Sequence, residues 1–73
     1  MKVMIGKRLR SVPRKKAIQM AEIFKDQVPL GIYAIEKGDY LELRKDRCSS
    51  KSAVKNLRRQ YKAMGFKVYA NGI

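Results

Sequence analysis

The chain is short and strongly basic: its 73 residues include 18 Lys and Arg, 6 Asp and Glu and no His, which gives a net charge of +12 at pH 7. With 45% hydrophobic residues it can form a core, so we expect one small basic domain over residues 1–73 rather than a disordered chain. The lack of His removes the usual general base and metal ligand. The single cysteine, Cys48, excludes an internal disulfide and a structural zinc site.

No targeting or membrane segment is visible in the sequence. The basic start of the chain is not followed by the apolar segment of a signal peptide. No apolar run approaches the ~18 residues of a membrane-spanning helix. We therefore expect a cytoplasmic protein that has no membrane partner.

The charge is concentrated at the two ends of the chain. Residues 1–16 carry a net charge of +7, residues 17–46 carry −2 and residues 47–73 carry +7. All six acids lie in the middle segment, so neither end can neutralise itself. A polyanion would relieve the repulsion within both ends, and nucleic acid is the commonest polyanion.

The first part of the chain predicts a short strand and a helix. Met1–Ile5 is an apolar run closed by Gly6 and is typical of a strand. Residues 7–13 form a basic connection, and Pro13 suits the start of a helix. A helix is expected from Arg14 to about Gln27, because apolar residues recur there at helical spacing. These residues are Ala17, Met20, Ala21, Phe24 and Val28.

The first turn of this helix carries three consecutive cations, Arg14, Lys15 and Lys16. The helix dipole disfavours positive charge at this end. Because local conflicts of this kind tend to mark function, we include all three among the candidate binding residues.

A β-hairpin is predicted next. The runs Leu30–Glu36 and Asp39–Arg44 flank Lys37 and Gly38, and Gly38 can adopt the positive φ of a tight turn. A two-residue loop pairs Glu36 with Asp39, whereas a loop one residue longer would reverse the faces of one strand. On the two-residue register one face carries Ala34, Leu41, Ile32 and Leu43, and the other carries Tyr33, Ile35, Tyr40, Glu42 and Arg44.

The segment Lys51–Met64 predicts an amphipathic helix. Ser49 or Ser50 can cap its start and Gly65 its end. At about 100° per residue, five apolar side chains share one arc: Ala53, Val54, Leu57, Tyr61 and Met64. Five cations share an adjacent arc about 100° wide: Lys51, Lys55, Arg58, Arg59 and Lys62. No acid interrupts the cations, which favours an anion-binding surface over a merely solvated helix face.

With a last strand at Phe66–Ala70, the order is β-α-β-β-α-β, which predicts an α+β protein with a ferredoxin-like arrangement. Two helices would cover one face of a small antiparallel sheet. If the first strand does not form, the order becomes α-β-β-α-β with a flexible basic N-terminal arm.

This order resembles the topology of the RNA-recognition-motif fold over the whole chain. The signature of that family is not met, because residues 38–43 read Gly-Asp-Tyr-Leu-Glu-Leu and Val3–Ile5 offers no stacking aromatic. The ending from Ala53 to Ala70, a helix followed by Gly, an aromatic residue and a strand, is similar to part of a SPOR domain, a peptidoglycan binder. Neither resemblance assigns the chain to a family.

No catalytic constellation, cofactor-binding loop or metal-ligand cluster is present in the sequence, so we expect no enzyme activity, no cofactor and no metal. Tyr33, Tyr40 and Tyr69 are candidates for stacking on bases, because all three can lie on a sheet face that the helices leave open. The alternative is that they only cover the sheet.

We expect a non-catalytic nucleic-acid-binding protein, RNA favoured over DNA, that makes largely sequence-independent phosphate contacts. A small core also makes a homodimer plausible. The alternative function is that of a small phage-type inhibitor or modulator, which would bind an acidic host protein or a toxin or defence ribonucleoprotein. The candidate nucleic-acid-binding residues are Lys7, Arg8, Arg10, Arg14, Lys15, Lys16, Arg44, Arg47, Lys51, Lys55, Arg58, Arg59, Lys62 and Lys67.

Overall fold

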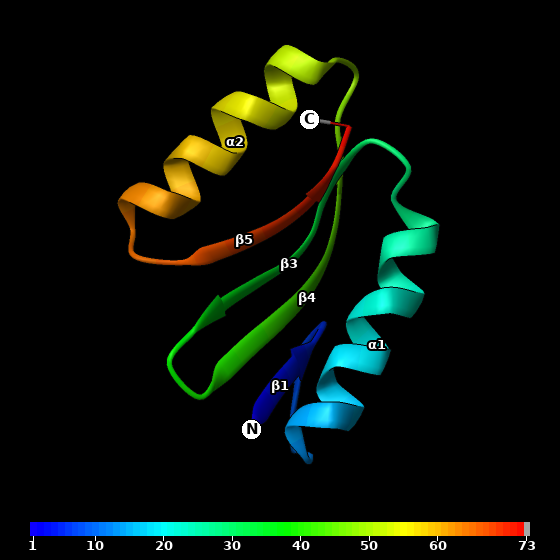
Figure 1. The fold of residues 1–73 in the computed structure, drawn as a ribbon, viewed down its shortest axis with the longest axis vertical. Coiled ribbons are helices and arrows are strands. Elements are labelled where there is room, and N and C mark those ends of the chain that lie inside the picture. The colour runs from blue at the N-terminus through cyan, green and yellow to red at the C-terminus, as the bar shows by residue number, and fades with distance from the viewer. Residues whose placement is uncertain (73) are drawn as a thin grey trace.

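The computed structural model describes residues 1–72 and consists of one five-stranded sheet and two helices (Figure 1). The predicted α+β class is therefore confirmed. In chain order the elements are β1 (Lys2–Ile5), β2 (Arg8–Ser11), α1 (Arg14–Gln27), β3 (Gly31–Lys37), β4 (Tyr40–Arg47), α2 (Lys51–Ala63) and β5 (Lys67–Asn71).

The strand order differs from the ferredoxin-like prediction. The sheet runs β2-β1-β4-β3-β5, and β1 pairs with β4 in parallel while the other pairs are antiparallel. The additional strand β2 lies within residues 7–13, for which the sequence predicts a basic connection. Strand β2 occupies the sheet edge beside β1. The last strand, β5, pairs with β3 at the other edge of the sheet. Since β1 does form, the alternative with a flexible N-terminal arm does not apply.

The predicted placement of both helices on one face of the sheet is wrong. One core cluster packs around Ala17 and Ala21 of α1, and a second packs around Val54 of α2. Ala34 belongs to the first cluster and its neighbour Ile35 to the second, and both are buried. Because adjacent residues of a strand point to opposite faces, the two helices lie on opposite sides of the sheet (Figure 1).

The chain path explains this arrangement. The crossovers β2-α1-β3 and β4-α2-β5 each link two parallel strands, and both move in the same direction across the sheet. Strands β2 and β4 run in opposite directions, as the pairings of both with β1 show. When two right-handed crossovers start from strands that are antiparallel to each other and cross the sheet in the same direction, their helices must lie on opposite faces.

A β-bulge in β3 changes the predicted faces of the hairpin. The register shifts between Ile32 and Ala34, so Ile32 joins the α2 cluster while Tyr33 packs against the α1 cluster. The turn also moves by one residue, because Lys37 pairs with Tyr40 rather than Glu36 with Asp39. The predicted faces of Ile32 and Tyr33 were therefore wrong, whereas Ala34, Leu41 and Leu43 share the α1 face as predicted.

Both helices begin where the sequence predicted. Helix α1 spans Arg14–Gln27, and α2 is capped by the Ser50 hydroxyl, which accepts a hydrogen bond of 3.1 Å from the backbone N–H of Ala53. Helix α2 ends at Ala63, and the side chain of Met64 is exposed rather than packed in the core.

A glycine at the start of β3 allows the close approach of two strands. Gly31 has φ +145°, and a Cβ there would lie 2.0 Å from the carbonyl oxygen of Asp46. Gly6 has φ +60° in the β1–β2 turn, where a Cβ would have nothing within 4 Å.

We therefore expect Gly6→Ala to lower the free energy of unfolding by about 1 kcal/mol, the cost of a left-handed backbone. Gly31→Ala should cost about 3 kcal/mol or more, because the β3–β4 pairing must shift. Urea denaturation of the two variants measures both costs. If both variants lose the same free energy of unfolding, the close approach of β3 and β4 at Gly31 is contradicted.

Candidate nucleic-acid interface

The outer surface of α2 carries a group of closely spaced cations. Four side chains line one shallow hollow of about 310 Å³, and Lys51 lies one turn before them on the same arc. Among residues 1–72, none of these five side chains lies in an ion pair. We call the five residues the α2 basic surface: Lys51, Lys55, Arg58, Arg59 and Lys62.

Packing beneath the helix fixes the direction in which the α2 basic surface points. Val54 is fully buried, and Leu57 and Tyr61 pack in the same cluster. The Tyr61 hydroxyl donates a hydrogen bond of 3.0 Å to Asp46 on β4. These contacts prevent rotation of α2 about its axis, so the cations remain on the solvent side.

Arg44, a predicted binding residue, is paired with two acids of its own strand. Its Nε donates to Asp46 over 2.7 Å, and its Nη1 pairs with Glu42. The guanidinium also lies over the ring of Tyr61, 5.4 Å from the ring centroid. The hydrogen bond to Asp46 raises the pKa of Arg44 further above its usual value. Arg44 thus binds acids of its own strand, and those acids are not available to neutralise α2.

The three tyrosines predicted to share one open face do not come together. Tyr33 and Tyr69 lie on the α1 face with their ring centroids 6.1 Å apart and their planes tilted by 47°. Tyr40 lies on the opposite face, where its hydroxyl donates to Glu42 over 2.6 Å. The alternation of side chains along β4 and the bulge in β3 together separate them.

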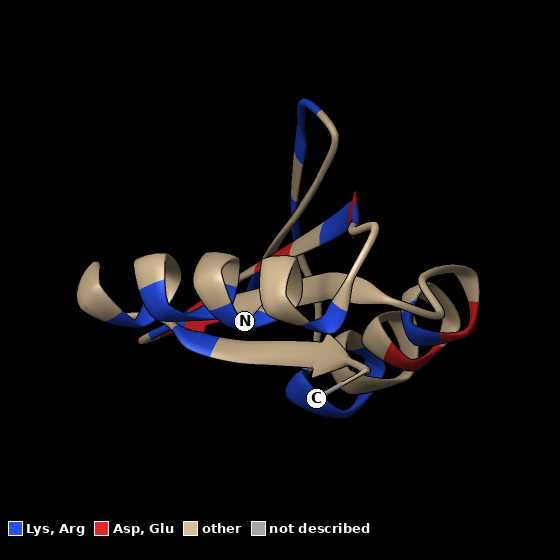
Figure 2. Ribbon diagram, turned by 90° about the horizontal axis from the view of Figure 1, so that it is seen from above, with Lys and Arg blue, Asp and Glu red and all other residues tan. Residues whose placement is uncertain are grey.

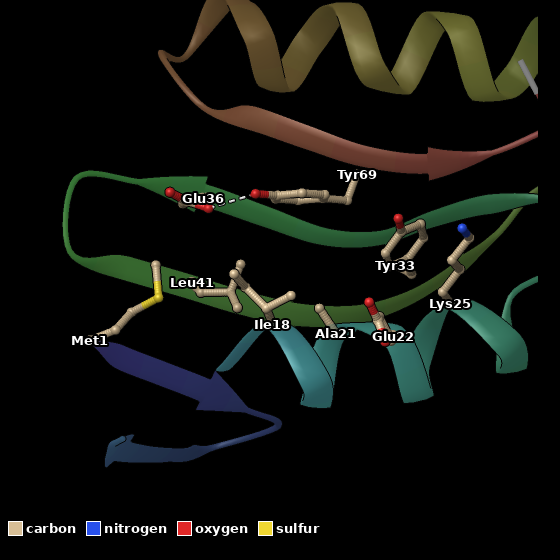
Figure 3. A pocket seen from close by; sticks show the side chains of 9 residues that line it. All are labelled: Met1, Ile18, Ala21, Glu22, Lys25, Tyr33, Glu36, Leu41 and Tyr69. Atoms are coloured by element: carbon tan, nitrogen blue, oxygen red, sulfur yellow. Dashed lines mark hydrogen bonds between the residues drawn. The ribbon is translucent and has the colours of Figure 1, made fainter. Parts of the chain in front are cut away.

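Tyr33 and Tyr69 line a cavity of about 160 Å³ between α1 and the sheet (Figure 3). The Tyr69 hydroxyl donates a hydrogen bond of 2.7 Å to Glu36, and burial together with this bond raises the pKa of Tyr69. Arg14 contacts the other oxygen of Glu36 at 3.4 Å. The hydroxyl of Tyr69 is therefore engaged within the protein, and the ring of Tyr33 packs beside that of Tyr69.

The basic residues of the N-terminal segment lie apart from α2. Arg8 and Arg10 are exposed on edge strand β2, Lys7 is in the β1–β2 turn, and Lys15 and Lys16 are exposed in the first turn of α1. Figure 2 shows Lys and Arg along α2, at the tip of the β1–β2 hairpin and on α1. The structure thus does not join all the predicted cations into one surface.

The two remaining predicted cations have contacts of their own. Arg47 donates to the carbonyl oxygen of Gln27 over 3.1 Å, and the ammonium of Lys67 lies 5.2 Å from the ring centroid of Tyr69. Lys45 is not among the predicted binding residues, and its ammonium lies over the ring of Phe24 on the α1 face. Lys45 follows Leu43 by two residues along β4, and this spacing could have placed Lys45 on the same face of the sheet as Leu43.

Residues 1–72 contain neither a cluster of metal-ligating side chains nor a membrane-spanning helix. Cys48 is half-buried, with its sulfur 3.7 Å from the carbonyl oxygen of Asp46.

Comparison with known proteins adds no identification: no protein-family model, no curated protein sequence and no solved structure matches this chain.

The network on β4 has a measurable consequence at alkaline pH. The hydrogen bond to Glu42, with a smaller effect of burial, raises the pKa of Tyr40 from 10.0 to about 12. Because the folded protein holds this proton more tightly than the unfolded chain does, the contribution to stability is present below pH 10 and is lost as the pH rises towards 12.

We expect a phenolate absorbance titration of the folded protein to show a late step near pH 12, and Tyr40→Phe to remove that step. Circular dichroism at each pH confirms that the protein is still folded. If the Tyr40→Phe protein shows the same late step, with unchanged size and position, the assignment of that step to Tyr40 is contradicted.

Proposed function

We propose that this protein binds nucleic acid without catalysis, mainly through phosphate contacts made by the α2 basic surface. The observation that carries the proposal is the hollow lined by Lys55, Arg58, Arg59 and Lys62, which no acid of residues 1–72 neutralises. Arg and Lys form strong charge-assisted hydrogen bonds with phosphate oxygens, and a nucleic acid presents many of these in a row. Contacts of this kind position a protein on a nucleic acid but do not read its sequence.

RNA is the favoured ligand because of the polar residues beside the cations. Ser52, Asn56 and Gln60 are exposed and follow the α2 basic surface around the helix. Their neutral side chains can exchange hydrogen bonds with a 2′-hydroxyl, which only RNA provides. A role in the cytoplasm fits such a ligand and the single free thiol.

The first test compares two variants that lose the same charge. Arg58→Gln, Arg59→Gln and Lys62→Gln together remove three contacts from the α2 basic surface. Lys2→Gln, Lys25→Gln and Lys37→Gln together remove three cations that lie on three different elements. Both variants have the same net charge. Because Lys37 donates a hydrogen bond to the carbonyl oxygen of Met64 at the end of α2, circular dichroism checks that α2 is intact in the control, and a remaining difference in affinity reports on position.

We expect the α2 variant to bind RNA on the order of 100-fold more weakly at about 0.1 M salt, and the slope of log K against log salt to become shallower by roughly 2–3. The scattered variant should lose much less affinity. Fluorescence anisotropy with double-stranded RNA, single-stranded RNA and DNA of equal length measures these values. Equal losses in the two variants would place the site elsewhere, and no binding by the wild-type protein would favour an acidic protein partner instead.

A further inference from the structure

A second basic surface lies on the α1 face of the sheet. Val3 and Ile5 of β1 pack in the α1 cluster, and their cross-strand partners on β2 are Arg10 and Arg8. Since directly paired residues share a face, both arginines lie on the same side of the sheet as α1.

Helix α1 adds a cation to this surface. Arg14 and Ile18 lie on the flank of α1 that faces β3 and β5, as their contacts with Glu36 and the cavity beside Tyr69 show. Lys16 lies about 160° around the helix from Ile18, and therefore on the flank towards β1 and β2.

Lys45 of β4 lies on the same face of the sheet, where its ammonium packs over the ring of Phe24 of α1. Among residues 1–72 none of these four cations lies in an ion pair. We call the four the β2–α1 basic surface: Arg8, Arg10, Lys16 and Lys45.

We propose that the β2–α1 basic surface is a second phosphate-binding site, and that one molecule of this protein bridges two segments of double-stranded nucleic acid. This inference depends on the proposed function, because it assigns a second segment to a protein whose α2 basic surface holds the first. The sheet and its two cores lie between the surfaces, so a single straight duplex cannot contact both.

The stiffness of a duplex excludes wrapping as the explanation for two surfaces. The protein measures 33 × 25 × 21 Å, whereas a DNA duplex is stiff over about 150 base pairs. A short duplex therefore meets one surface only. The repulsion among the cations of the other surface remains until a second duplex binds there.

The test uses two populations of RNA duplexes of about 12 base pairs, one labelled with a donor fluorophore and one with an acceptor. The duplexes are present in excess over the protein. Two variants with equal charge loss are compared: Arg8→Gln, Arg10→Gln and Lys16→Gln on the β2–α1 basic surface, and Arg58→Gln, Arg59→Gln and Lys62→Gln on the α2 basic surface. Anisotropy measures binding and energy transfer measures bridging in the same samples, and circular dichroism confirms the fold.

We expect energy transfer with the wild-type protein and its loss in both variants, while the β2–α1 variant still binds RNA through α2. Sedimentation should give complexes that contain one protein and two duplexes. Wild-type binding without energy transfer would overturn the bridging inference and leave the proposed function intact. Energy transfer that persists in the β2–α1 variant would also overturn it, because a dimer bridging through α2 alone gives that result. No binding at all would overturn both proposals.

Discussion

The architecture depends on the reversal of the chain at the β1–β2 turn. Because β2 runs back along β1, helix α1 leaves from a strand that is antiparallel to β4, and the two crossovers then place α1 and α2 on opposite faces. Without this reversal the two helices would share one face and the other face of the sheet would be open. The positions of both basic surfaces follow from this one turn.

The few acids of the chain determine which cations are free. Glu42 and Asp46 hold Arg44, and Glu36 contacts Arg14, so acids on the central strands are paired with cations of the same strand or of α1. Tyrosine hydroxyls from Tyr40, Tyr61 and Tyr69 donate to the same three carboxylates. Because these acids are paired at the sheet, they do not neutralise the cations of α2 and β2, which face solvent.

The sequence was sufficient to predict elements with strong periodicity, such as α1 from Arg14 to about Gln27 and α2 with a serine cap at its start. It was not sufficient for β2, because the strand reads Arg-Leu-Arg-Ser and its single apolar residue gives no alternation to detect. The bulge at Tyr33 has no sequence signature either, and it moved this tyrosine to the α1 face. The cations of the candidate site were therefore predictable residue by residue, but their division between two faces required the tertiary structure.

We propose that two unneutralised surfaces on opposite faces of one sheet both bind phosphate. The most direct measurement is a titration of the isotope-labelled protein with a short RNA duplex, followed by the backbone amide shifts in NMR spectra. We predict two separate sets of perturbed amides, one in residues 55–62 of α2 and one in residues 8–16, with the second set saturating at a higher RNA ratio. A single perturbed set, or perturbation confined to the cavity beside Tyr33 and Tyr69, would contradict the claim.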